Sequence, residues 1–554
     1  MKKNKFNRLG LLKKNLKLQD LPSGSQRKFL LVQIDGLSYS LLQKLRTTRY
    51  LPFTHGLLQN GYHVTKYDPG YPTTTPFIQA GILYNDNSTI PGFRFLDKKT
   101  QRSFNCGITS DARYLENELQ EKNYGILRGG SSIGTIFCGD ASRSILTVAH
   151  LYRTESGRKK IRDVIIVILL NPLQTLHVFL ATVSEFFVEL SESLRDFLRS
   201  ILYWEHSNSP FFYPYFPFFR AFINAIAREI STQAGVLEMD RNSPYIYVTY
   251  GGYDWIAHYR GPESESGFHI LKEIDADVRK LYKQAQKKGY DFYIYSDHGQ
   301  IPSIPFEKLY YESFASFVQR ISKLSARGFS GHDTEWNWNK YLYYKLEYYY
   351  DNISLPFRAL AKGFSQLIKH TILKKKKDPA INWKNTEQIM LLYSSSLAHM
   401  YFNHSPEHLD LSDIEQKYPG FVLKLVQHPG VGFVIGTQGK NIEIIHAKGK
   451  VILKDKSVSF EGERFLRLYG DEEKLVRQLK YFAQIKYCGD LIINGAYDGK
   501  RIVAFESFHF GSHDSVGGKQ NEAFFLSKDK INLDGVLNAK ELYKIFYAYH
   551  QTKK

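Results

Sequence analysis

Carboxylate, imidazole and hydroxyl side chains recur in five short motifs along the 554-residue chain. In order, the motifs are Asp35-Gly36, Tyr71-Pro72-Thr73-Thr74-Thr75-Pro76, Asp254-x-x-x-His258, Asp297-His298-Gly299 and Gly511-Ser512-His513. Together they offer three carboxylates, three imidazoles and a hydroxyl, which are oxygen and nitrogen donors that suit zinc. Two zinc ions about 3.5–4 Å apart can clamp the attacking and leaving oxygens of an in-line displacement. The donor set therefore indicates a two-zinc hydrolase.

Three of the motifs follow short apolar runs that are typical of buried strands. These runs are residues 28–34, 245–250 and 291–296. Helical patterns such as 266–286 lie between them, and strands alternating with helices favour a mainly parallel α/β sheet. Such sheets bind ligands beyond the carboxyl ends of their strands, where Asp35, Asp254 and Asp297 would meet. Asp-Gly is also a common turn dipeptide, so turn chemistry remains an alternative for each aspartate alone.

The order and surroundings of the motifs resemble the alkaline phosphatase superfamily, specifically its nucleotide pyrophosphatase/phosphodiesterase branch and the bacterial relatives of that branch. The resemblance rests on the segments 33–36, 71–76, 90–95, 253–262, 296–299 and 511–518. It covers roughly residues 27–150, 236–300 and 395–530. It implies a three-layer α/β/α core of the alkaline phosphatase type with a mainly parallel sheet, plus two largely helical insertions.

The resemblance also implies a role for each motif residue. One zinc would be held by Asp35, Asp297, His298 and the nucleophile's oxygen, and the other by Asp254, His258 and His513. Thr75 would be the nucleophile, because the family pattern places it three residues after the proline that matches Pro72. Thr74 remains an alternative, because other relatives place the nucleophile two residues before a proline, here Pro76. Thr73 is the least favoured of the three.

The implied reaction is hydrolysis of a phosphodiester or phosphoanhydride bond through a phosphothreonine intermediate. A threonine hydroxyl is a poor nucleophile at neutral pH, and coordination to zinc favours its alkoxide. The expected substrate is a phosphate-containing small molecule or a lipid or glycan phosphodiester, bound by residues that the sequence does not identify. One alternative is a phosphomonoesterase or phosphotransferase on the same two-metal site. A less favoured alternative is a membrane- or nucleic-acid-binding protein with a residual site.

Two positions depart from the family pattern. Asp514 follows His513 where many bacterial relatives have glycine, so it either orients that imidazole or reflects drift. Asn85 stands where relatives often have a turn glycine, which Asn can replace because it tolerates the left-handed region. Asn85 and Asn87 are expected to be turn residues. Histidines expected to be structural or exposed are His150, His177, His269 and His509.

Two stretches outside the motifs are expected to be insertions. Residues 151–235 contain a basic run, an apolar run at 164–170 and then apolar residues at helical spacing from Leu173 to Ile201. This spacing predicts a long amphipathic helix, and we favour one packed on its own domain over a membrane-surface or partner-binding helix. Residues 301–394 are rich in Tyr and Lys. The expected core segments are 27–150, 236–300 and 395–554, after a basic tail at 1–26.

The composition limits the class of protein and its partners. Hydrophobic residues make up 43% and aromatic residues 15%, which excludes a disordered chain. The 74 Lys and Arg exceed the 55 Asp and Glu by 19, so anionic partners are expected: a phosphorylated substrate and a peripheral anionic membrane contact, without specific nucleic-acid recognition. Neither a signal peptide nor a transmembrane span is recognised, which favours a cytoplasmic or membrane-peripheral location. The three cysteines form no disulfide or zinc-binding pattern.

Overall fold

The computed structural model describes residues 27–151, 172–203, 216–329 and 388–551. The expected basic tail, the apolar run at 164–170 and the middle of the Tyr- and Lys-rich stretch lie outside the described residues.

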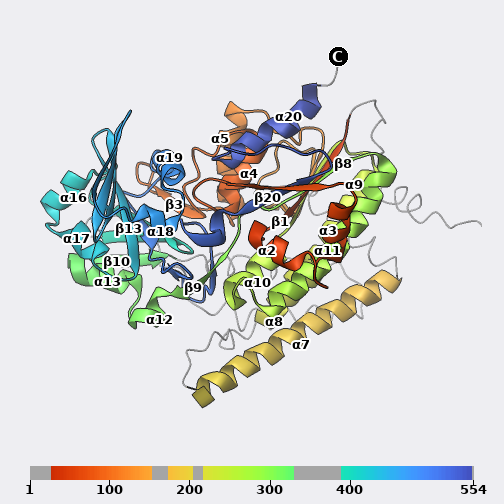
Figure 1. Ribbon diagram of the computed structural model, residues 1–554, viewed down its shortest axis with the longest axis horizontal. Helices are drawn as coiled ribbons and strands as arrows, with labels where there is room; N and C mark the ends of the chain where they lie inside the picture. The colour runs from red at the N-terminus through yellow and green to blue at the C-terminus, as the bar shows by residue number, and fades with distance from the viewer. Residues whose placement is uncertain (1–26, 152–171, 204–215, 330–387, 552–554) are drawn as a thin grey trace, which may run out of the picture.

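A seven-stranded sheet lies at the centre of the fold (Figure 1). Its strand order is β2-β20-β8-β1-β7-β5-β6. The strands are β1 (Phe29–Ile34), β2 (His63–Tyr67), β5 (Ser131–Ile133), β6 (Arg143–Ile145), β7 (Tyr245–Tyr250), β8 (Asp291–Tyr295) and β20 (Ala523–Ser527). Strands β8, β1, β7, β5 and β6 pair in parallel, whereas β20 is antiparallel to both β8 and β2. The three apolar runs predicted as strands are therefore neighbours in one mainly parallel sheet.

Helices cover both faces of this sheet, because its strands carry apolar side chains on both sides. Phe29 and Leu31 of β1 belong to one core, which includes residues of α4 (Thr75–Tyr84), α5 (Thr109–Lys122) and α20 (Tyr543–Gln551). Leu30 and Val32 belong to a second core on the opposite face. That core contains residues of α2 (Tyr39–Leu45), α3 (Pro52–Gln59), α9 (Arg228–Asp240), α10 (Gly252–Arg260) and α11 (Glu265–Lys288). The predicted three-layer α/β/α core is confirmed.

A second sheet of eight strands lies beside the first. Its order is β10-β11-β12-β17-β13-β14-β15-β16. The strands are β10 (Ser325–Phe329), β11 (Gln388–Ser394), β12 (Leu397–Phe402), β13 (Val431–Gln438), β14 (Asn441–His446), β15 (Gly449–Leu453), β16 (Val458–Gly462) and β17 (Leu491–Gly495). One core of this sheet contains residues of four helices: α12 (Phe306–Tyr310), α13 (Phe314–Ser322), α16 (Leu411–Lys417) and α17 (Phe421–Val426). Two further helices, α18 (Leu466–Tyr469) and α19 (Glu472–Phe482), belong to the core that also contains Phe29 and Leu31. The described ends of the stretch 301–394 thus contain strands as well as helices.

A small three-stranded sheet joins distant parts of the chain. It consists of β9 (Ile301–Pro305), β18 (Ile502–Ala504) and β19 (Gly511–Ser512), in the order β18-β9-β19. Strand β19 is antiparallel to β9, with Ser512 opposite Ile301. Because β9 begins shortly after His298 and β19 ends directly before His513, this pairing brings the two imidazoles together. Their rings stack with centroids 3.9 Å apart.

Helix α7 (Pro172–Tyr203) is the predicted long amphipathic helix, and it runs along one edge of the molecule (Figure 1). It is followed by α8 (Phe216–Ala221) and a π-helix (Phe222–Ala227) that leads into α9. The helix contacts its own domain, as favoured, but with its acidic side: Glu185 and Glu189 are buried against Arg220. No helix within the described ranges is long and apolar enough to cross a membrane.

The two asparagines near the start of the chain have structural positions. Asn85 caps the carboxyl end of α4 in the left-handed conformation, with φ of 57°. The Asn87 side chain donates to Asn538 Oδ1 at 2.9 Å and accepts from the Tyr481 hydroxyl at 2.7 Å. Both residues therefore stabilise local structure.

Gly36 follows β1 in the chain and packs closely against Asp254 of α10. This close approach allows a specific test. Its φ is 73°, and an added Cβ would lie 2.5 Å from Asp254 Oδ1. Gly61 has a φ of 83° but open space around it. Gly36→Ala should therefore lower Tm by several degrees, roughly three times the effect of Gly61→Ala, because only the first adds a steric clash to backbone strain. Thermal unfolding of both variants checks this, and equal shifts would contradict the close approach.

Candidate metal centre and active site

The predicted motif residues converge at the carboxyl end of the central sheet. Asp35 directly follows β1, Asp297 and His298 follow β8, and α10 carries Asp254 and His258 just after β7. Because β8, β1 and β7 are adjacent, their three carboxylates meet at one edge. His298 Nε2 lies 3.5 Å from Asp35 Oδ1 and 3.4 Å from Asp297 Oδ2.

The second half of the site centres on Asp254. His258 Nε2 lies 3.3 Å from Asp254 Oδ2 and 3.0 Å from His513 Nε2. One donor atom from each of Asp254, His258 and His513 can be chosen so that all lie within 4.8 Å of one another. The same holds for Asp35, Asp254 and His298. The structure thus brings together both predicted ligand sets, with Asp254 near the two of them.

The three imidazoles share one orientation, with Nδ1 towards a backbone carbonyl and Nε2 towards the site carboxylates. Their Nδ1 atoms lie close to backbone carbonyl oxygens: His258 to Gly511 at 2.9 Å, His298 to Gly299 at 3.1 Å and His513 to Thr73 at 2.9 Å. A proton on Nδ1 satisfies such a contact and leaves the Nε2 lone pair free for a cation. The Nε2 atoms of all three rings lie within 3.6 Å of site carboxylate oxygens.

The electrostatics of the site also fit bound cations. Burial raises the pKa of Asp35, and the neighbouring Asp297 and Asp254 carboxylates raise it further. Burial would also raise the pKa of Asp254, but His258 and His513 hold it far below its usual range. The buried Asp297 Oδ2 has no hydrogen-bond partner among the described residues. Buried carboxylates this close need positive charge nearby, which a metal ion supplies when bound.

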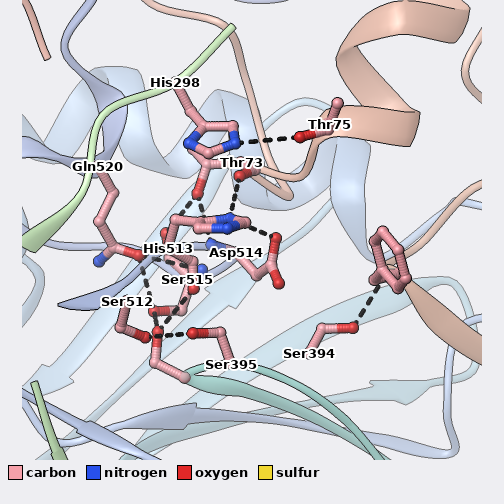
Figure 2. A network of polar contacts seen from close by, with 12 residues as sticks. Thr73, Thr75, His298, Ser394, Ser395, Ser512, His513, Asp514, Ser515 and Gln520 are labelled. Carbon is pink, nitrogen blue, oxygen red and sulfur yellow. Dashed lines mark hydrogen bonds and ion pairs between the residues drawn. The ribbon is translucent and has the colours of Figure 1, made fainter. Parts of the chain in front are cut away.

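Asp514 lies directly against the His513 ring. Its Oδ1 is 2.8 Å from His513 Nδ1, as Figure 2 shows. Burial lowers the pKa of His513, but Asp514 and Asp254 more than offset this and raise it to about 9. Asp514 has a φ of 79°, a conformation that glycine adopts without strain. The contact supports the interpretation that Asp514 orients His513.

The three threonines of the second motif occupy different environments. Thr75 is the first residue of α4, and its Oγ1 lies 3.3 Å from Asp35 Oδ1. The same oxygen lies 3.3 Å from His298 Nε2, as Figure 2 shows. The Thr73 hydroxyl instead accepts from the Asp514 backbone N–H at 2.9 Å. The Thr74 hydroxyl is buried without a hydrogen-bond partner among the described residues. Of the three hydroxyls, that of Thr75 is therefore the one in contact with predicted metal ligands.

Two neighbours of the site do not stand out in the sequence. Gln300 donates to the Asp254 carboxylate and backbone carbonyl, at 2.5 and 2.9 Å. His509, expected to lack a ligand-like setting, lies with its ring centroid 4.3 Å from that of His258. His509 Nε2 lies 3.1 Å from Glu506 Oε2, and this carboxylate is outside the predicted ligand set. In the sequence, the one sign that His509 lies near the site is its position four residues before His513.

A cavity of about 370 Å³ opens beside the site. Thr75, Asp254, His258 and His513 lie in its wall. Much of the remaining wall is apolar and comes from the core and from the π-helix after α8: Phe93, Leu146, Phe222, Ile223, Trp255 and Tyr259. A substrate whose phosphorus reaches Thr75 would place an adjoining group against these apolar side chains.

A family model described as type I phosphodiesterase / nucleotide pyrophosphatase matches residues 29–370, more than half of the chain. The chain belongs to this family. The resemblance to the alkaline phosphatase superfamily is thereby confirmed, as is the prediction of a phosphoric ester hydrolase. Members of the family are metal-dependent, and the donor groups described above agree with that property. No curated protein sequence matches the chain.

Solved structures with a similar fold include two ectonucleotide pyrophosphatase/phosphodiesterase 5 proteins and a phosphonoacetate hydrolase. The murine protein, inactive and in complex with AMP, is 11% identical with a TM-score of 0.44. The human protein is 12% identical with a TM-score of 0.44. The hydrolase from Sinorhizobium meliloti 1021, in complex with phosphonoformate, is 12% identical with a TM-score of 0.41. Each alignment covers 95% of both chains. The family assignment rests on the sequence match.

The contact between Asp514 and His513 predicts an effect on metal binding. Asp514→Asn removes the charge that holds the ring, so zinc affinity should fall about 10- to 100-fold. Competition with a fluorescent zinc chelator measures this. The exposed Asp534 gives a matched control, because Asp534→Asn makes the same chemical change at a carboxylate that is not part of the predicted site and should leave zinc affinity unchanged. Unaltered affinity in Asp514→Asn would show that the contact has no role.

Proposed function

We propose that this protein hydrolyses phosphodiester or phosphoanhydride bonds at a site that holds two zinc ions. One ion would be held by Asp35, Thr75, Asp297 and His298, and the other by Asp254, His258 and His513. The observation that carries the proposal is the common orientation of the three imidazoles, each anchored at Nδ1 and directed by Nε2 towards the carboxylates. Nitrogen and carboxylate donors in this number suit zinc.

Bound ions would supply charge neutralisation and Lewis acidity to the phosphoryl oxygens and to the oxygens that attack and leave. The residues of the chain would position the reacting groups. Thr75 Oγ1 is fixed between Asp35 and His298, and its place at the start of α4 puts the positive end of the helix beside the reacting oxygen. Thr75 is half-buried and lies in the wall of the cavity, from which a substrate would reach it.

The reaction would proceed in two displacements. Thr75 Oγ forms a bond to phosphorus and loses its proton as the bond between phosphorus and the leaving oxygen breaks. The leaving oxygen takes up a proton, which gives a phosphothreonine and a free alcohol or phosphate. A water molecule then attacks the same phosphorus, the bond to Thr75 Oγ breaks, and the hydroxyl regains a proton.

The cavity suggests which substrates fit. Its apolar wall favours a phosphodiester in which a group next to phosphorus is apolar or aromatic, within the expected range of small molecules and lipid or glycan phosphodiesters. Contact with an anionic membrane, the second expected partner, concerns a different surface, helix α7, and does not bear on this chemistry.

The nucleophile can be tested by substitution. Thr75→Ala should lower kcat for a phosphodiester about a thousandfold or more, because it removes the attacking oxygen. Thr75→Ser, which keeps a hydroxyl, should retain part of the activity. Thr74→Ala is the matched control, since it removes a neighbouring buried hydroxyl and should stay within a few-fold of wild type. Full activity in Thr75→Ala would exclude Thr75 as the nucleophile.

Substrate class can be tested with two chromogenic compounds. The zinc-loaded enzyme should hydrolyse bis-p-nitrophenyl phosphate with a higher kcat/KM than p-nitrophenyl phosphate, because the apolar wall can receive the second aryl group. A chelator should abolish both activities, and added zinc should restore them. Clear preference for the monoester would instead support the phosphomonoesterase alternative.

A further inference from the structure

Helix α7 exposes a continuous row of large apolar side chains. We call this row the apolar face; it consists of Leu176, Phe179, Leu180, Val183, Phe187, Val188, Leu190 and Leu194. These eight residues are more than half of the 14 large hydrophobic residues exposed within the described ranges. At 1.5 Å per residue, the helix is about 48 Å long. An exposed apolar patch of this kind marks an interaction surface.

The opposite side of α7 carries its acidic residues and is turned towards the domain. Arg220, which is 1% exposed, lies 2.8 Å from each of Glu185, Glu189 and Glu192. Arg260, from helix α10, also pairs with Glu189. The orientation is the reverse of that of a helix that faces water, in which charged residues point outward and apolar residues point inward.

Among residues 175–195 of α7, whose side chains the structure describes, no carboxylate is exposed. The charged residue that remains exposed there is Arg195. The whole chain has a formal net charge of +19. An anionic surface would therefore attract the protein and meet no acidic group on the apolar face.

We propose that the apolar face of α7 binds the surface of an anionic lipid bilayer, with the helix lying in the plane of the interface. A second copy of the chain fits less well, because it carries the same net charge of +19 and would be repelled. Helix α7 runs along the edge of the molecule (Figure 1), and its exposed apolar residues follow this one helix. Such a row matches an interfacial helix better than a compact protein interface with a polar rim.

The position of α7 links this surface to the catalytic cavity. The π-helix that contacts α7 supplies Phe222 and Ile223 to the cavity wall. Arg260, which pairs with Glu189 of α7, lies two residues after His258 on helix α10. Docking through the apolar face would therefore hold the cavity close to the bilayer surface. Binding itself does not depend on the proposed hydrolysis.

Vesicle co-sedimentation of the full chain tests the proposal. Wild type should sediment with vesicles of phosphatidylglycerol and phosphatidylcholine, and Leu180→Asp should weaken this binding at least about tenfold, since it places a carboxylate in the apolar face. Leu423→Asp is the matched control: Leu423 is 57% exposed on α17, Leu180 is 56% exposed, and binding should be unchanged. The Thr75→Ala protein should bind like wild type even though hydrolysis stops.

A fluorescent reporter gives a second measurement. The substitution Phe187→Trp adds a tryptophan to the apolar face. On vesicle binding, the emission of this variant should shift to the blue relative to that of wild type measured in parallel. Brominated acyl chains should also quench the variant more strongly than wild type. Absence of wild-type binding to the vesicles would overturn the proposal, as would equal losses in Leu180→Asp and Leu423→Asp. A dimer in light scattering that Leu180→Asp dissociates, without vesicle binding, would assign the face to a second copy.

Discussion

The repulsion among three neighbouring carboxylates, two buried and one partly buried, is the constraint around which the site is built. Asp35, Asp254 and Asp297 lie at the ends of or just after three adjacent parallel strands, so the topology of the sheet itself forces them together. The surrounding structure offsets part of the repulsion: Gly36 donates its N–H to Asp297, Gln300 donates to Asp254, and the imidazoles approach all three. Burial and the neighbouring carboxylates still raise the pKa of Asp35, so these contacts alone do not fully offset the cost of its negative charge.

Much of this site could be predicted from the sequence because its parts are local. An apolar run followed by aspartate is visible in one stretch, and the spacing of Asp254 and His258 needs only one helical turn. The inclusion of His513 depended on family resemblance, since no local pattern shows that β19 pairs with β9. The eight-stranded sheet was not predicted for the same reason: two of its strands, β10 and β11, lie within the Tyr- and Lys-rich stretch 301–394, and the other six follow that stretch.

Helix α7 shows a different limit of sequence reasoning. Apolar periodicity correctly predicts that the helix has two unlike sides, but it does not say which side contacts the domain. That choice depends on Arg220, which lies beyond the end of the helix, and on Arg260 in α10. A buried guanidinium without carboxylate partners would be strongly unfavourable, so the ionic contacts determine how the helix is rotated about its axis.

The pairing of β9 with β19 has a consequence for the order in which the protein becomes functional. Residues 301 and 512 are opposite each other in this sheet, although 211 positions separate them in the chain. During synthesis, Thr75, the proposed nucleophile, and five of the six proposed metal ligands leave the ribosome long before His513. A nascent or prematurely terminated chain can therefore fold much of its central sheet and still lack a complete centre. The proposed centre is therefore complete only after His513 has been added to the chain.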